Sequence, residues 1–153
     1  MLAFEDSFDV ETTPEKAYSY IVNQETMVKL VPDLLKYEKV NDDEMKITAK
    51  AGVSFIKGKF DLVLDIKDKT ENKHITLIGQ GNGSGASVDF TVNFDFSFSN
   101  SETIVNWKAE INIVGTAASM GARMIKSASQ KYIIKLVGNY KKALEDEQET
   151  EVK

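Results

Sequence analysis

Hydrophobic and polar residues alternate along most of the first 115 positions of the chain. Near the start, Phe4, Phe8 and Val10 are separated by charged residues, which predicts a strand with one buried face. The same period of two recurs from Leu34 to Val114 in about six further segments, most clearly between Val88 and Phe98. Short turn-like segments join these strands, so we expect one antiparallel sheet of about seven strands with one apolar face.

Two short helices are predicted directly after the first strand. Thr13 can cap the first free amides of a helix, Pro14 suits the first helical position, and Glu15 favours the positive end of the helix dipole. A second helix should follow from about Gln24, and Pro32 should end it.

A long helix is predicted near the C-terminal end. It should start after Gly115, with Thr116 or Ser119 as its cap, and run to about Asp146. Its apolar residues fall close to one stripe: Ile125, Ala128, Tyr132, Leu136, Val137, Tyr140 and Leu144. The predicted fold is therefore α+β, with a curved antiparallel sheet wrapped on the long helix. Residues 1–145 should form a single domain, followed by an acidic tail at 146–153.

Composition narrows the functional classes. The 153 residues are 42% hydrophobic and 28% charged, which is typical of an ordinary globular domain. The chain has no cysteine and one histidine, so it cannot form a disulfide, a thiolate zinc site or a multi-histidine metal site, and no cofactor is expected. The net charge of −5 disfavours nucleic acid as a partner. No segment is typical of a transmembrane anchor or a secretory signal, which predicts a cytoplasmic protein.

Charge is unevenly distributed toward the C-terminus. Residues 144–153 carry five acidic residues and one lysine, whereas residues 115–143 have no acidic residue and six basic ones: Arg123, Lys126, Lys131, Lys135, Lys141 and Lys142. This basic segment could be a solvated helix face, a peripheral contact with anionic lipid headgroups, or a docking site for an acidic partner protein. The acidic tail disfavours simple lipid binding because its charge repels an anionic surface.

The apolar face of the sheet and the helix combine large rings with small residues. Such a set can interlock into a solid core or line a hydrophobic cavity for a small molecule, and both interpretations stay open. Arg123 is a candidate for the rim of such a cavity. The candidate lining residues are Phe60, Leu62, Leu77, Phe90, Val92, Phe94, Trp107, Ala109, Ile111, Met120, Met124, Ala128 and Tyr132.

Two further features have simpler explanations than catalysis. The glycine-rich run at 79–86 contains a GxGxxA pattern, but it precedes a strand, whereas a dinucleotide fingerprint must open a helix. It therefore predicts a flexible connection between strands. His74 lies near a turn in a lysine-rich stretch, and we expect it to be exposed rather than catalytic.

Several motifs, taken in order, carry a family resemblance. They are FDVETTPEKAY at 8–18, AG and KGKF within 51–60, GQG and GAS within 79–87, WKA at 107–109, and VGTAASMGAR at 114–123. Together they resemble the carbon monoxide dehydrogenase G-subunit family, within the START-like helix-grip (SRPBCC) superfamily. The resemblance covers about residues 3–142.

The resemblance implies a helix-grip fold and a non-catalytic accessory role. A protein of this kind would assist a molybdenum-containing carbon monoxide dehydrogenase or a related hydroxylase, in maturation or membrane recruitment. It would bind a hydrophobic small molecule, quinone-like or lipid-like, between the sheet and the last helix. Two departures stand out: the family often has Pro-Gly where this chain has Pro32-Asp33, and some members continue into a membrane anchor where this chain has an acidic tail.

Two alternatives from other functional classes remain. One is an enzyme of the aromatase/cyclase kind, which needs an acid–base pair facing the cavity and for which Tyr132 is the best-placed proton donor. The other is a protein-interaction module that uses the basic helix, with Lys126, Lys131 and Lys135 at its centre.

Overall fold

The computed structural model describes residues 2–50, 58–83, 85–115 and 121–152, with side chains as far as residue 146. All seven described strands form one antiparallel sheet in the order β1-β7-β6-β5-β4-β3-β2. This confirms the predicted sheet. The strands are β1 (Leu2–Val10), β2 (Leu34–Lys39), β3 (Glu44–Lys50), β4 (Lys59–Thr70), β5 (His74–Gly83), β6 (Ala86–Ser99) and β7 (Glu102–Gly115).

Helices α1 (Pro14–Val22) and α2 (Gln24–Met27) connect β1 to β2. Thr13 caps α1 as predicted, because its side chain accepts a hydrogen bond from the Lys16 amide. The second helix is shorter than predicted: α2 gives way to a 3₁₀ turn, η1 (Val28–Leu30). A 3₁₀ turn at a helix end is common, since it satisfies the last carbonyl groups within a tighter turn.

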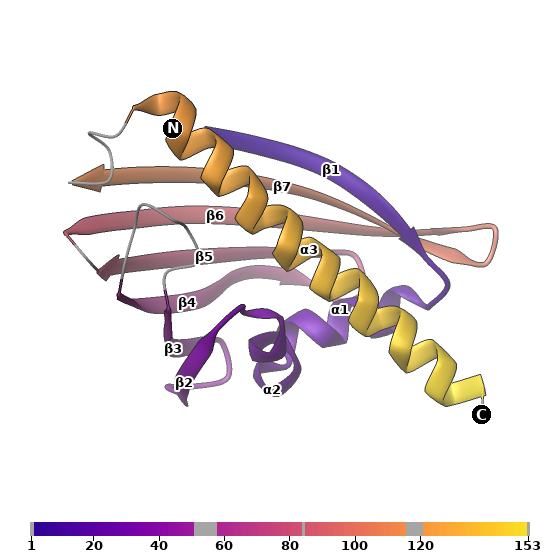
Figure 1. The fold of residues 1–153 in the computed structure, drawn as a ribbon. Coiled ribbons are helices and arrows are strands. Elements are labelled where there is room, and N and C mark those ends of the chain that lie inside the picture. Colours follow the sequence, from indigo (N-terminus) through magenta and orange to yellow (C-terminus); the bar gives the residue numbers. More distant parts are fainter. Residues whose placement is uncertain (1, 51–57, 84, 116–120, 153) are drawn as a thin grey trace.

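The long helix α3 (Ala122–Val152) lies diagonally across one face of the sheet (Figure 1). Its two predicted capping residues lie outside the described residues. The helix continues past the predicted end near Asp146, since no proline or glycine follows Asn139 and most of the last residues favour helix. The division between a domain at 1–145 and a tail at 146–153 stays a prediction.

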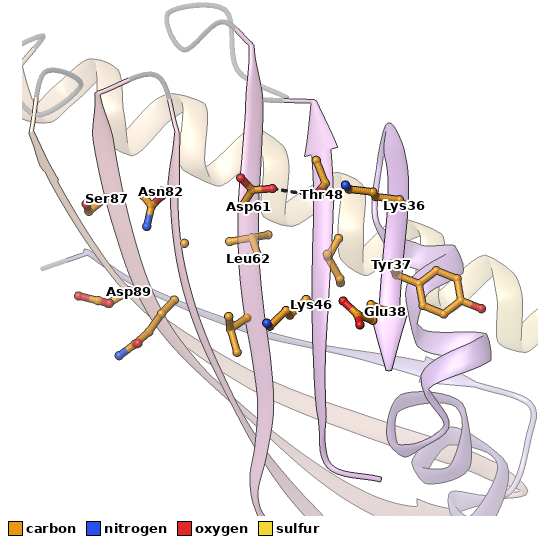
Figure 2. A pocket seen from close by; sticks show the side chains of 14 residues that line it. Lys36, Tyr37, Glu38, Lys46, Thr48, Asp61, Leu62, Asn82, Ser87 and Asp89 are labelled. Carbon is orange, nitrogen blue, oxygen red and sulfur yellow. Dashed lines mark hydrogen bonds between the residues drawn. The ribbon is translucent and has the colours of Figure 1, made fainter. Parts of the chain in front are cut away.

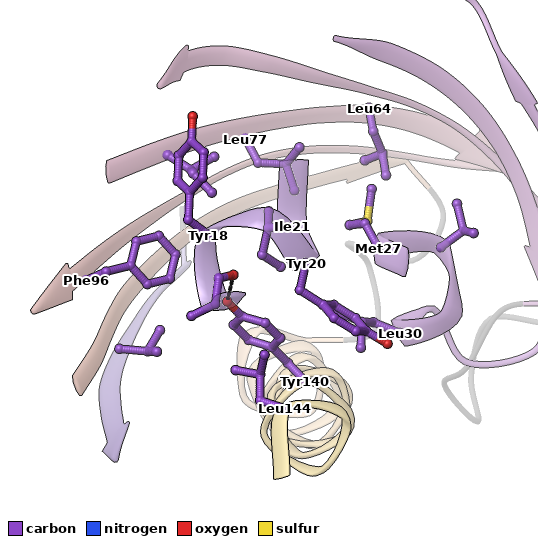
Figure 3. Packing of buried hydrophobic residues seen from close by; sticks show 14 of the residues in the cluster. Tyr18, Tyr20, Ile21, Met27, Leu30, Leu64, Leu77, Phe96, Tyr140 and Leu144 are labelled. Carbon is purple, nitrogen blue, oxygen red and sulfur yellow. Dashed lines mark hydrogen bonds between the residues drawn. The ribbon is translucent and has the colours of Figure 1, made fainter. Parts of the chain in front are cut away.

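One end of the space between the sheet and α3 is a solid core (Figure 3). The Tyr140 ring is 2% exposed and packs edge-on against Phe8 and Phe94, with centroids 5.7 and 6.1 Å away. Its hydroxyl donates a hydrogen bond to the carbonyl oxygen of Ala17 in α1. Leu144, one turn further along α3, is fully buried in the same cluster. These contacts attach α3 to α1 and close this end of the fold.

None of the described helices contains a segment that is both long and apolar enough to cross a bilayer. The cytoplasmic location inferred from the sequence stays a prediction.

Candidate functional site

The inner face of the sheet is built from aligned rows of side chains. Antiparallel register places Trp107 opposite Phe94, Ala109 opposite Val92, and Ile111 opposite Phe90. Alternation along each strand directs these side chains toward α3 and their sequence neighbours toward the opposite face. The residues that the alternation predicts to face inward therefore form one continuous apolar surface.

Glycines in β5 allow large side chains to lie flat on this surface. Gly81 pairs with Leu62 across the β4–β5 ladder. A Cβ added at Gly81 would lie 2.2 Å from a methyl carbon of Leu62 and 2.8 Å from the Asp61 carbonyl oxygen. No side chain fits at position 81 without moving its neighbours, so the glycine leaves room for Leu62 to cover the strand.

Beyond the solid core, an apolar cavity of about 290 Å³ lies between the sheet and α3. This is near the lower end of the volume range of small-molecule sites. The cavity is lined by Ile21, Met27, Leu30, Val31, Ile47, Ala49, Lys50, Phe60, Leu62, Leu64, Leu77, Val88, Phe90, Val92, Phe94, Trp107, Ala109, Ile111, Ile113, Ser129, Tyr132, Ile133, Leu136, Val137 and Tyr140.

The structure brings ten of the thirteen predicted cavity residues together around this space. They are Phe60, Leu62, Leu77, Phe90, Val92, Phe94, Trp107, Ala109, Ile111 and Tyr132. Met120 lies outside the described residues. Arg123 is exposed on the first turn of α3, and its role at a rim stays a prediction.

The prediction wrongly assigned two helix residues to the cavity lining. Met124 is 49% exposed, and Ala128 is half-buried without lining the cavity. Each precedes by one position a buried residue, Ile125 or Ser129. One position turns a helix by about 100°, so the inward face begins one residue later than the prediction placed it.

The prediction missed Ser129 and six lining residues of the sheet: Ile47, Ala49, Lys50, Leu64, Val88 and Ile113. Two further groups of lining residues were also missing. The first is on α3 itself, where Ile133, Leu136, Val137 and Tyr140 continue the lining beyond Tyr132. Their spacing of three and four residues could have identified them. The second comes from the short helices and the residue after them: Ile21, Met27, Leu30 and Val31. No sequence pattern indicates that this segment folds back over the sheet to form a wall.

Few polar side chains reach the cavity. Among the described lining residues, none carries a carboxylate, an amide or an imidazole. The buried Tyr140 hydroxyl is already bonded to Ala17, and burial raises the pKa of Tyr140 well above its ordinary value. Burial, and secondarily the Asp33 carboxylate, also raises the pKa of Tyr132, so both phenols stay neutral at physiological pH. The site offers a largely apolar surface with neutral hydroxyl groups.

A second hollow lies on the outer face of the sheet, opposite α3 (Figure 2). This groove of about 560 Å³ spans β2 to β6 and is lined mainly by polar side chains of both charges. Thr48 Oγ1 donates a hydrogen bond to Asp61 Oδ1 at 2.7 Å across the β3–β4 ladder. Its charged residues, Lys36, Glu38, Lys46, Asp61 and Asp89, are all exposed. Water competes for each of these charges, so the inner cavity is the stronger candidate for a binding site.

His74 is half-buried rather than exposed as predicted, with 27% of its side chain accessible. Its Nδ1 lies 2.8 Å from Asp95 Oδ1 and its Nε2 lies 2.9 Å from Thr76 Oγ1. Asp95 faces His74 across the β5–β6 ladder, and Thr76 lies two residues further along β5. Both shield the ring, and the linear sequence does not reveal the contact with Asp95. Alternation places His74 on the outer face, since Ile75 faces the core. In the part of the chain that the structure describes, no three potential metal ligands gather at one point.

Comparison with known proteins agrees with this architecture. The sequence model of the carbon monoxide dehydrogenase G subunit (CoxG) matches residues 7–145. A conserved protein from Geobacillus kaustophilus has a similar structure, with a TM-score of 0.85 at 20% identity over 94% of this chain and 95% of that chain. A START superfamily protein from Mycobacterium smegmatis gives a TM-score of 0.70 at 10% identity over 94% and 97%. At these identities the two structures show a common START-like fold. No curated protein matches the sequence.

Proposed function

The chain belongs to the CoxG family, the G-subunit family of carbon monoxide dehydrogenase. From this premise we propose that it is a non-catalytic binding protein for a hydrophobic small molecule, quinone-like or lipid-like. The molecule would occupy the cavity between the inner face of the sheet and α3. In the same proposal the protein is accessory to a molybdenum carbon monoxide dehydrogenase-type enzyme and serves its maturation or its recruitment to the membrane.

The lining of the cavity is the observation that carries this proposal. A space of about 290 Å³ walled by aliphatic and aromatic side chains favours an apolar guest, because transfer of apolar surface out of water is favourable. The cyclase alternative needs an acid–base pair in the cavity. The described lining residues include no histidine, aspartate or glutamate to form one, which favours binding over catalysis.

A size-blocking variant tests the binding role. Val92 lines the cavity, whereas Val63 is 39% exposed and faces the outer groove. Val92→Phe should fill the cavity, and Val63→Phe adds the same atoms on the opposite face. Protein purified from cells is extracted with organic solvent and the extract is analysed by mass spectrometry. In parallel, the neutral dye N-phenyl-1-naphthylamine is titrated into each protein and followed by fluorescence.

We expect one hydrophobic molecule per protein in the extracts of the wild type and Val63→Phe, and a depleted extract from Val92→Phe. Dye affinity should follow the same order. Circular dichroism checks that both variants fold. An empty wild-type extract together with no saturable dye binding would contradict the proposal, as would equal binding by the two variants.

The exposed basic side chains of α3 favour a second function, which is docking to an acidic surface of the partner enzyme. Arg123, Lys126, Lys131, Lys135, Lys141 and Lys142 are all exposed. Charge reversal of Lys126, Lys131 and Lys135 to glutamate should abolish co-purification with the cell's own molybdenum enzyme and leave dye binding intact. Unchanged co-purification after charge reversal would refute this docking role.

A further inference from the structure

The cavity has a chemical bias beyond its hydrophobicity. Its side-chain polar groups belong to Lys50, Trp107, Ser129, Tyr132 and Tyr140. Every one of these groups can donate a hydrogen bond, and the lysine and indole groups cannot accept one. Since the described lining has no carboxylate or amide, the cavity is rich in donors and poor in strong acceptors.

Most of these donors are unsuited to anchoring a guest. The Tyr140 hydroxyl is already bonded to the Ala17 carbonyl. Lys50 is exposed and belongs to the end of β3, where water solvates its ammonium group. The Trp107 ring is packed within a cluster formed with Ala109 and Ile133. The hydroxyls of Ser129 and Tyr132 remain, one turn apart on α3.

Tyr132 is the better placed of these two. Its phenol extends further from the helix than a serine hydroxyl does, and it makes no hydrogen bond to any residue that the structure describes. Asp33 is close enough to act on it electrostatically, yet no hydrogen bond joins the two side chains. Tyr132 is half-buried and lines the cavity. A tyrosine hydroxyl beside an apolar space usually has a hydrogen-bond partner, and a molecule in the cavity can supply one.

We propose that the Tyr132 hydroxyl donates a hydrogen bond to a neutral oxygen acceptor, such as a carbonyl, on the molecule held in the cavity. This inference rests on the proposed binding function and adds a selection rule to it. Among guests of equal size, the cavity prefers one with a carbonyl oxygen to a pure hydrocarbon. The phenol is suited to this role because a tyrosine is protonated at neutral pH, and a protonated phenol donates to neutral acceptors.

Two rigid probes of nearly equal shape test the rule: 9-fluorenone, which has a carbonyl group, and fluorene, which has a methylene group in the same place. Their affinities are measured by displacement of N-phenyl-1-naphthylamine from the wild type, Tyr132→Phe and Ser129→Ala. The quantity of interest is the ratio of the two affinities in each protein, since the ratio cancels effects of a variant on general packing.

We expect Tyr132→Phe to lower the ratio of the 9-fluorenone affinity to the fluorene affinity roughly 2- to 10-fold. The affinity for fluorene itself should be unchanged. Ser129→Ala removes the other remaining hydroxyl of the lining, and its ratio should stay closer to the wild-type ratio than that of Tyr132→Phe does. The infrared carbonyl band of bound 9-fluorenone should shift to lower wavenumber in the wild type and return toward its value in hydrocarbon solvent in Tyr132→Phe.

Each other outcome has a definite meaning. Saturable binding of both probes with the same ratio in the wild type and Tyr132→Phe would overturn the anchor and leave the binding function standing. Loss of the preference in Ser129→Ala alone would also overturn it. If neither probe displaces the dye from the wild type, the binding function fails together with the anchor. An unshifted carbonyl band in the wild type overturns the anchor even if Tyr132→Phe does not fold.

Discussion

The outer edge of the Phe90 ring lies over Gly79, its cross-strand partner in the β5–β6 ladder. A Cβ built on Gly79 would be 2.0 Å from Cζ of Phe90, and both Cε atoms of the ring would lie within 2.5 Å. No such contact can exist, so the absence of a side chain at 79 is what lets the ring lie flat on the sheet. The ring thereby lines the cavity without filling it.

Gly79→Ala should therefore push the Phe90 ring off the sheet and into the cavity. We expect a loss of stability of about 1–3 kcal/mol, typical of overpacking, and weaker binding of N-phenyl-1-naphthylamine. Gly138→Ala on α3 is the matched control, because a Cβ there meets nothing within 4 Å. An alanine within a helix should raise stability by about 0.5–1 kcal/mol and leave dye binding unchanged. Urea unfolding checks both values, and equal effects of the two variants would contradict the packing argument.

The strands were largely predictable because their signal is local. Alternation of apolar and polar residues decides which side chains face the core, so Phe90 and Trp107 could be assigned to one surface without knowledge of the strand order. The same reasoning cannot say whether that surface is covered tightly or loosely. The Tyr140 end is filled and the Val92 region is hollow, although both ends have similar composition.

The errors arose where tertiary contacts override local pattern. The prediction placed Met124 and Ala128 on the face of α3 that points to the sheet. The apolar stripe of the helix is wide near its start, so several neighbouring residues are compatible with that face. The wall formed by Met27 and Leu30 depends on how α2 and η1 fold back over the sheet. His74 is shielded by Asp95, which is distant in sequence and becomes its neighbour through β5–β6 pairing.

The C-terminal half of α3 should carry much of the stability of the fold. Leu144 is fully buried in the cluster that joins α3 to α1, whereas Ile134 on the same helix is 62% exposed. Leu144→Ala should lower the free energy of unfolding by about 2–5 kcal/mol, because it leaves a cavity in a well-packed core. Ile134→Ala should change it by no more than about 0.5 kcal/mol. Similar losses in thermal or urea unfolding would show that the end of α3 is not anchored in this way.

The burial of the Tyr140 hydroxyl should give the protein a distinctive response to alkali. Burial raises the pKa of Tyr140 well above 10.0, so its contribution to stability is fully present below the unfolded value and is lost as pH rises toward the folded value. Tyr140→Phe should cost about 0.5–1.5 kcal/mol near neutral pH, where the bond is lost. Above about pH 10 its stability should fall less steeply than that of the wild type.

Urea unfolding at several pH values between neutral and alkaline measures this difference directly. Tyr37→Phe is a suitable control, since Tyr37 is 46% exposed on β2. That variant should follow the wild-type curve throughout. Parallel curves for the wild type and Tyr140→Phe across the alkaline range would contradict the assigned role of Tyr140.

Asp33 should act on Tyr132 through space, and this coupling can be measured separately from ligand binding. Asp33 has a φ of 54°, and asparagine tolerates this backbone conformation as well as aspartate does. Asp33→Asn therefore removes the negative charge with little change in backbone strain. The pKa of Tyr132 should fall, because the carboxylate no longer disfavours the tyrosinate.

The fall should be incomplete, because burial is the larger cause of the shift and persists in the variant. Ultraviolet titration of tyrosinate, taken as the difference between proteins with and without Tyr132→Phe, isolates this one phenol among the five tyrosines. We expect its pKa in Asp33→Asn to lie below the wild-type value and still above 10.0. An unchanged pKa would mean that Asp33 does not act on Tyr132. A value at or below 10.0 would mean that the phenol is solvated rather than held against the cavity.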